Sequence, residues 1–187
     1  MITLLALRNP EPEYARTRHN IGADVLRAFA ESNNFPAFKY DKFLKAEKTI
    51  STIGDHDVQL LLSGTYMNES GQVVAASKLT PEETIVIHDE LNVPVGDLKI
   101  SYGAGAGGHN GVASVTSTFG TAAYTRLRIG IEPNHPVTGD ARANFVLKPF
   151  TPEERQKIED NIKTFTAALI TIIKEGRDTA MLKYHTK

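Results

Sequence analysis

Short apolar runs that alternate with segments of helical periodicity limit the possible fold more than any other feature of this chain. Continuous apolar runs of this length are typical of strands buried on both faces. The runs cover residues 2–7, 85–87 and 127–131. Between them, apolar side chains recur at helical spacing at Ile21, Val25, Ala28 and Phe29. The alternation predicts an α/β fold with a mixed, mostly parallel twisted sheet and helices on both faces.

Local signals place further elements in this plan. A polar turn at residues 54–57 separates two strand-like runs and predicts a hairpin of 46–53 with 58–62. Residues 70–78 suit a helix, and residues 98–102 suit another strand. Thr151, Pro152 and Glu154 form an N-cap, a proline at the first helical position and a capping-box acid, so a long helix should begin there. Gly176 is well placed to end it.

Length and composition narrow the class of protein. A chain of 187 residues supports one substantial core, so we expect a single domain over residues 1–187. The 21 basic and 22 acidic residues give a formal net charge of -1, so any contact with RNA must use a local patch. The chain has no cysteine, which excludes disulfides, thiolate nucleophiles and cysteine-ligated metals.

The N-terminal segment has neither the basic start nor the longer apolar core of a signal peptide. No apolar run approaches the roughly 20 residues that a membrane-spanning helix needs. We therefore expect a cytoplasmic protein that does not insert into a membrane.

The six histidines are the side chains best able to move protons near neutral pH. Those expected to be solvated stand in a turn, a loop and the C-terminal tail: His56, His135 and His185. The others stand at a strand–loop–helix junction, beside an aspartate and in a glycine-rich stretch: His19, His88 and His109. A carboxylate that accepts from one ring nitrogen fixes the tautomer of a general base, and Asp89 is a candidate to do this for His19. Each histidine taken alone is better explained as a helix cap or a buried hydrogen-bonding group, and only their combination favours a chemical role.

Three asparagines stand near the ends of predicted elements: Asn9, Asn68 and Asn110. Their amides suit them to hold a carbonyl, orient a water or donate to an oxyanion. Asn-Pro and Asn-Gly are also ordinary turn dipeptides, so Asn9 and Asn110 alone decide nothing. The glycine-rich run 103–108 predicts a mobile loop that acts as a hinge or lid, or brings backbone N–H groups to an anion.

Five ordered stretches carry a resemblance to a known family. They are Asn9-Pro10 continued by Thr17-Arg18-His19-Asn20-Ile21-Gly22, then residues 65–71, then His88-Asp89-Glu90-Leu91, then residues 107–111 and 126–131. In this order they resemble the successive signatures of bacterial-type peptidyl-tRNA hydrolase, and residues 144–150 are similar as well. The resemblance is in register over residues 1–150, with looser support from the final helix. It implies hydrolysis of the ester between the peptide and the terminal ribose of peptidyl-tRNA, by a monomer without a cofactor or metal.

The resemblance also implies roles for individual residues. His19 would be the base that activates water, and Asp89 the carboxylate that sustains its basic form. Asn9 would help to tell blocked from free aminoacyl groups, while Asn68 and Asn110 would hold the peptide main chain, the water or the tRNA end. The remaining implied contacts to the tRNA or the cleft are those of Tyr14, Tyr66, Met67, His109, Lys99 and Arg128, with Arg126, Arg142 and Lys148 as further candidates for phosphates.

The chain departs from the family pattern at several positions around the implied tRNA site. Ser101 stands where the family commonly has a basic residue of a phosphate clamp, and Arg8 and Glu11 stand where it usually has glycine. A glycine position can require positive φ or close approach, so we expect a differently shaped Asn9 loop and altered tRNA affinity.

Two other functions remain open. A noncatalytic relative of the same fold would keep an RNA surface without turnover, because fold does not guarantee function. A metal-dependent hydrolase would use His19, His88, Asp89 and His109, although these residues lack the short ligand spacings of a zinc motif. A serine hydrolase is not indicated, since no Gly-x-Ser-x-Gly elbow occurs.

Overall fold

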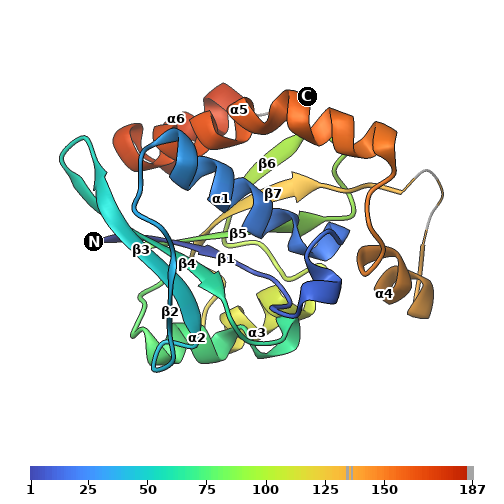
Figure 1. Cartoon of the computed structure of the whole chain (residues 1–187), viewed down its shortest axis with the longest axis horizontal. Helices are drawn as coiled ribbons and strands as arrows, with labels where there is room; N and C mark the ends of the chain where they lie inside the picture. The colour runs from blue at the N-terminus through green and yellow to red at the C-terminus, as the bar shows by residue number, and fades with distance from the viewer. Residues whose placement is uncertain (134, 136, 185–187) are drawn as a thin grey trace.

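The computed structural model describes residues 1–133, 135 and 137–184, and it confirms the predicted α/β architecture (Figure 1). One mixed sheet of seven strands has the order β2-β3-β4-β1-β5-β7-β6. The strands are β1 (Ile2–Ala6), β2 (Lys39–Asp41), β3 (Ala46–Ile53), β4 (His56–Ser63), β5 (Thr84–Glu90), β6 (Leu98–Tyr102) and β7 (Thr125–Gly130).

Parallel pairing occupies the centre of the sheet and antiparallel pairing its edges. Strands β4, β1, β5 and β7 run parallel to one another. The outer strands β2 and β3 at one edge and β6 at the other pair antiparallel. The predicted hairpin of β3 and β4 is confirmed, and Gly54 turns it with a φ of 60°. The mostly parallel plan thus holds for the central strands.

Helices cover both faces of the sheet, as predicted. Figure 1 shows α1 (Ile21–Ser32), α5 (Pro152–Glu175) and α6 (Arg177–Tyr184) above the sheet, with α2 (Gly71–Ala76) and α3 (Asn110–Phe119) below it. Successive side chains along β1 point to opposite faces of the sheet. Leu4 therefore joins the core between the sheet and helices α1 and α5, while Leu5 joins the core between the sheet and helices α2 and α3. The predicted capping box is confirmed: Thr151 accepts from the Glu154 backbone N–H, and α5 ends before Gly176.

Some elements lacked a sequence signal strong enough to predict them. Strand β2 has only three residues, two of them charged, and α6 has a weak apolar stripe. The short helix α4 (Asp140–Val146), beside the edge of the sheet where the parallel strands end, has one buried residue, Val146. Among the described residues, no helix is both long and apolar enough to cross a membrane.

The carboxyl ends of the four parallel strands meet at one edge of the sheet, where ligands collect in folds of this kind. Asn9 follows the end of β1, and His88 and Asp89 lie in the last three residues of β5. The predicted position of these three residues at strand ends is confirmed, with β5 running on to Glu90. This edge is therefore the natural place for a site.

Candidate active site

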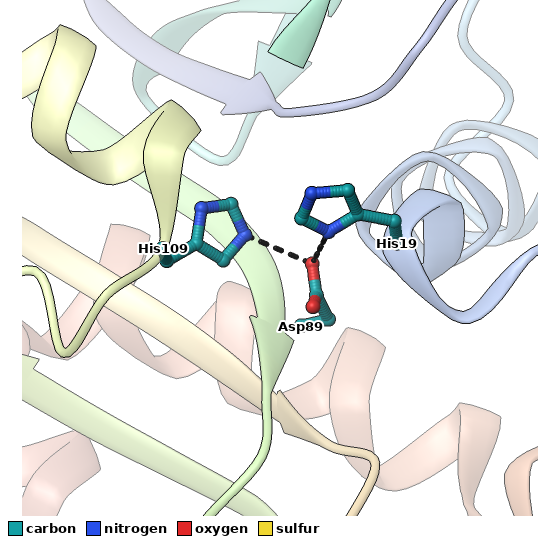
Figure 2. A group of neighbouring side chains, drawn as sticks. All are labelled: His19, Asp89 and His109. Carbon is teal, nitrogen blue, oxygen red and sulfur yellow. Dashed lines mark hydrogen bonds and ion pairs between the residues drawn. The ribbon is translucent and has the colours of Figure 1, made fainter. Parts of the chain in front are cut away.

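Two histidines from distant parts of the chain donate to one carboxylate oxygen at this edge (Figure 2). His19 Nδ1 lies 2.8 Å from Asp89 Oδ1, and His109 Nε2 lies 2.9 Å from the same oxygen. Asp89 is 3% exposed, so the carboxylate is nearly removed from water. The structure therefore brings together the predicted pair of His19 and Asp89, and adds His109 to it.

The backbone around His19 is fixed by the arginine that precedes it. His19 lies in the short 3-10 helix Arg18–Asn20, directly before α1. The Arg18 guanidinium forms a 2.6 Å ion pair with Glu154 and lies 4.2 Å from the centre of the Phe145 ring. The Arg18 backbone N–H also donates to the Lys148 carbonyl. These contacts fasten His19 to the junction between α4 and α5.

The hydrogen bonds of His109 fix its tautomer. Its Nδ1 accepts from the backbone N–H groups of Gly111 and Val112, so His109 is the N-cap of α3. The ring proton must then sit on Nε2, which donates to Asp89. His109 is therefore a neutral donor, and both of its ring nitrogens are engaged in hydrogen bonds with the protein.

His19 differs because only one of its ring nitrogens is engaged. Nδ1 carries the proton that it donates to Asp89, which leaves Nε2 with a lone pair. Within the described part of the chain, no hydrogen bond satisfies this Nε2, and His19 lines a cleft of about 340 Å³. His19 therefore presents an unprotonated nitrogen to the cleft.

Electrostatics favour a basic His19. Burial lowers its pKa, but the negative charge of Asp89 and the hydrogen bond to it outweigh burial and raise the pKa above its ordinary value. Burial raises the pKa of Asp89, yet the two histidines outweigh it and hold this pKa far below its usual range. Asp89 is thus ionised at every pH at which the protein would work.

His88, the third histidine of interest, points elsewhere. Its Nδ1 lies 2.6 Å from the Asp89 carbonyl oxygen, and its ring packs edge-on against His109. Burial above all, together with the positive charge of Arg126, holds the pKa of His88 well below its usual range, although the Asp89 carboxylate raises it. A buried neutral His88 does not reach the cleft and supports the fold of β5.

The donor atoms of His19, Asp89 and His109 lie within 4.8 Å of one another, a spacing that a metal ion could bridge. A metal on His109 Nε2 would have to replace the proton that the Nδ1 contacts place there, leaving an imidazolate. The N–H groups and the carboxylate already satisfy each other. This proton arrangement disfavours a metal at the cluster.

The Asn9 loop is held in place by asparagine contacts. Asn20 Oδ1 accepts from the Asn9 backbone N–H, and Asn20 Nδ2 donates to the Asn9 carbonyl. The Asn9 side-chain oxygen accepts from the Met67 backbone N–H at 2.8 Å. Met67 is buried, and its Sδ would lie 2.6 Å from a Cβ at Gly111, so the Met67 side chain would have to shift to admit a larger residue there. Asn9 thus ties the loop after β1 to the start of the 3-10 helix Met67–Glu69.

The other predicted recognition residues are open to solvent. Asn68 is exposed in the 3-10 helix Met67–Glu69, and Asn110 is exposed at the start of α3, where it lines the cleft. Tyr66 is 51% exposed, and Tyr14 is half-buried in the 3-10 helix Pro12–Tyr14. Hydrogen bonding to Glu11, followed by the negative charge of that carboxylate, raises the pKa of Tyr66. The departure at Glu11 therefore places an acid beside a predicted base-stacking residue.

The predicted cations separate into exposed and buried groups. Lys99 is exposed on β6, opposite Arg128 of β7. Arg128 donates through Nε and Nη2 to Glu90 Oε2, at 2.9 and 2.6 Å. Arg126 is only 1% exposed, so its prediction as a phosphate contact on the surface was wrong. The other candidates lie near the cleft, with Lys148 exposed and Arg142 half-buried.

Sequence reasoning missed the partners that hold the site together. Glu90 restrains Arg128, Asn20 clamps the Asn9 loop and Arg18 anchors His19. All three residues lie in the stretches that resemble the family signatures. Their spacing in sequence did not reveal these contacts, because each contact joins two different elements of the fold. Of the histidines expected to be solvated, His56 and His135 are exposed, and His185 lies outside the described residues.

Comparisons with known proteins point to one family. A family model described as peptidyl-tRNA hydrolase matches residues 3–187. A peptidyl-tRNA hydrolase from Legionella pneumophila is 41% identical over 177 residues, which are 92% of each chain. One from Neisseria meningitidis is 38% identical over 98% of this chain and 96% of its own. A crystal structure of peptidyl-tRNA hydrolase from Acinetobacter baumannii is similar with a TM-score of 0.88 and 31% identity, covering 98% of this chain and 94% of that one.

Proposed function

The chain belongs to the peptidyl-tRNA hydrolase family, and on this basis we propose that it hydrolyses the ester bond between a peptide and the terminal ribose of tRNA. The products are free tRNA and a free peptide, and the role is rescue of prematurely dissociated peptidyl-tRNA. We place this activity in the cytoplasm, where translation supplies the substrate, and assign it to a monomer with one domain over residues 1–187.

One observation carries the proposal. His19 donates through Nδ1 to the buried Asp89 carboxylate and turns its unprotonated Nε2 to the cleft. A general base needs a neutral imidazole, a fixed tautomer and a partner that stabilises the cation formed on proton uptake. His19 and Asp89 meet all three requirements.

The reaction follows from this arrangement. A water bound to His19 Nε2 gives up a proton as its oxygen attacks the ester carbonyl, and Asp89 stabilises the resulting imidazolium. The tetrahedral intermediate then expels the ribose oxygen, which takes the proton back from His19. No atom in this sequence requires a metal. The exposed amides of Asn68 and Asn110 are available to the carbonyl oxygen, to the water or to the peptide main chain.

Recognition uses residues on either side of His19. Asn9 discriminates blocked from free aminoacyl groups, on a loop fixed by Asn20 and Met67. Tyr66 and Tyr14 stack on bases of the tRNA end. Lys99 and Arg128 contact phosphate, and Arg128 must share its charge with Glu90.

The decisive test is peptide release from an N-blocked aminoacyl-tRNA with a chelator present, measured alongside binding of deacylated tRNA. The proposal expects release from the blocked substrate and at least tenfold slower release from free aminoacyl-tRNA. Loss of activity in chelator would point to a metal-dependent hydrolase instead. Binding of tRNA without release would establish a noncatalytic RNA-binding protein.

A further inference from the structure

Arg126 is a buried cation without a carboxylate partner among the described residues. It is one of the largest fully buried side chains, at 1% exposure in the second residue of β7. A charge buried without a partner destabilises a fold, because it loses its hydration and gains nothing in return. The nearby carboxylate of Glu90 is instead bonded to Arg128. Arg126 must therefore be compensated in another way.

The compensation comes from the backbone of the glycine-rich loop 103–108. Arg126 Nη2 donates to the Ala104 carbonyl at 2.6 Å and to the Gly105 carbonyl at 3.0 Å. A charged donor shared by two carbonyls forms stronger hydrogen bonds than a neutral donor would. The guanidinium thus binds the backbone carbonyls of two consecutive residues of the loop.

The loop has little else to hold it. Gly103 and Gly107 have positive φ, and a Cβ placed at Gly103, Gly105 or Gly107 would meet nothing within 4 Å. Side-chain packing holds this segment through Ala106, which packs against the core on the α2 and α3 face of the sheet, and the carbonyls of the loop are its other points of attachment. Arg142 donates to the Gly107 carbonyl at 2.8 Å, but that contact is exposed. Arg126 supplies the buried attachment.

The loop ends at His109, which contacts the catalytic carboxylate. The His109 backbone N–H donates to the Ala106 carbonyl at 3.0 Å, so the ring follows directly from the loop. His109 Nε2 then donates to Asp89, and its ring centre lies 4.8 Å from that of His19. A displacement of the loop would move His109 against both members of the proposed catalytic pair.

We propose that Arg126 is a positioning residue that holds the glycine-rich loop by the carbonyls of Ala104 and Gly105, and thereby sets His109 against Asp89. This inference rests on the proposed function of His19 and Asp89, but the loop contact can be tested without turnover. Arg126 acts through the loop and does not touch the reacting atoms.

The test compares Arg126→Met, which keeps the length and apolar volume of the side chain, with Arg126→Lys and His109→Ala. Arg177→Met is the matched control, because Arg177 stacks 3.9 Å from the centre of the Tyr102 ring, next to the same loop, without bonding to it. Three quantities are measured: backbone amide hydrogen exchange over residues 103–110, thermal stability, and kcat and KM for peptide release from N-blocked aminoacyl-tRNA.

Arg126→Met should speed amide exchange across the loop and lower kcat by about 10- to 100-fold, since misplacements near 1 Å cost on that order. KM and thermal stability should change little, and Arg126→Lys should recover part of kcat. The double variant Arg126→Met/His109→Ala should lose little more kcat than His109→Ala alone, because both changes act on one contact.

Additive losses in the double variant, or a loss of activity that follows only a loss of stability, would overturn the proposal. Unchanged amide exchange in Arg126→Met would also overturn it, even if the enzyme is active. If the unmodified protein releases no peptide, the proposed function fails, and the exchange measurement still decides whether Arg126 holds the loop.

Discussion

Two groups of proposed site residues differ in how the protein holds them. His19, Asp89 and His109 are buried or nearly so and are joined by hydrogen bonds of 2.8 and 2.9 Å. Asn68 and Asn110 are exposed, and across the described residues their side chains bond to no protein group. If the proposed roles hold, the proton-transfer group is fixed before substrate arrives, whereas the recognition groups acquire their partners from the substrate.

The largest effect expected from this contrast follows removal of the base. His19→Ala should lower kcat by about 10³-fold or more, because a positioned base contributes up to this order. Peptide release from N-blocked aminoacyl-tRNA measures it, with His56→Ala as an exposed histidine control. A variant that retains a tenth of kcat while folded would remove His19 from the mechanism.

Asp89→Asn should have the next largest effect, lowering kcat by about 10²-fold because the amide no longer stabilises the imidazolium. The rate requires neutral His19, so it falls as pH drops through the pKa of His19. Asp89 raises this pKa, and its loss should move the acid limb of kcat/KM to lower pH. An acid limb that stays in place in this variant would mean that another group controls it.

Among the exposed asparagines, Asn68→Ala should lower kcat/KM by about tenfold, the worth of roughly one hydrogen bond. Thermal stability should not change, because no protein partner of the side chain is lost. Glu69→Ala, the exposed neighbour in the same 3-10 helix, is the matched control. A destabilised Asn68→Ala protein would show that this asparagine supports the fold. It would also weaken the contrast between the buried histidine–aspartate group and the exposed asparagines.

The smallest effect is expected at the rim. Lys99→Ala should raise KM by about two- to fivefold and reduce the slope of log KM against log salt by about 0.7 to 0.9, the share of one phosphate contact. Lys39→Ala, exposed on β2 at the other edge of the sheet, should change neither quantity. Equal effects of the two variants would indicate diffuse attraction of tRNA in place of a defined contact at β6.

The sequence was most informative where one residue type has one structural consequence. Apolar runs marked β1 and β5, and the capping residues marked the start of α5, because burial and N-capping are local requirements. Strand β2 and helices α4 and α6 are short or polar, and they form through contacts with the rest of the fold that periodicity does not reveal.

The candidate site divides in the same way. His19, Asp89 and the asparagines were predicted from motif and from residue chemistry. The bond from His109 to Asp89 was not predicted, and neither was the burial of Arg126, because both depend on how three separate segments meet. The pairing of Arg128 with Glu90 likewise joins two residues that are 38 positions apart in sequence and lie on adjacent strands.

His19 is proposed to present an unprotonated Nε2 whose basicity is set by Asp89, and nitrogen-15 NMR of histidine-labelled protein can observe both properties. We predict that neutral His19 carries its proton on Nδ1. We also predict that the pKa of His19 is above the ordinary value for histidine and falls in Asp89→Asn. A proton on Nε2 in the neutral protein, or a His19 pKa that Asp89→Asn leaves unchanged, would contradict the proposal.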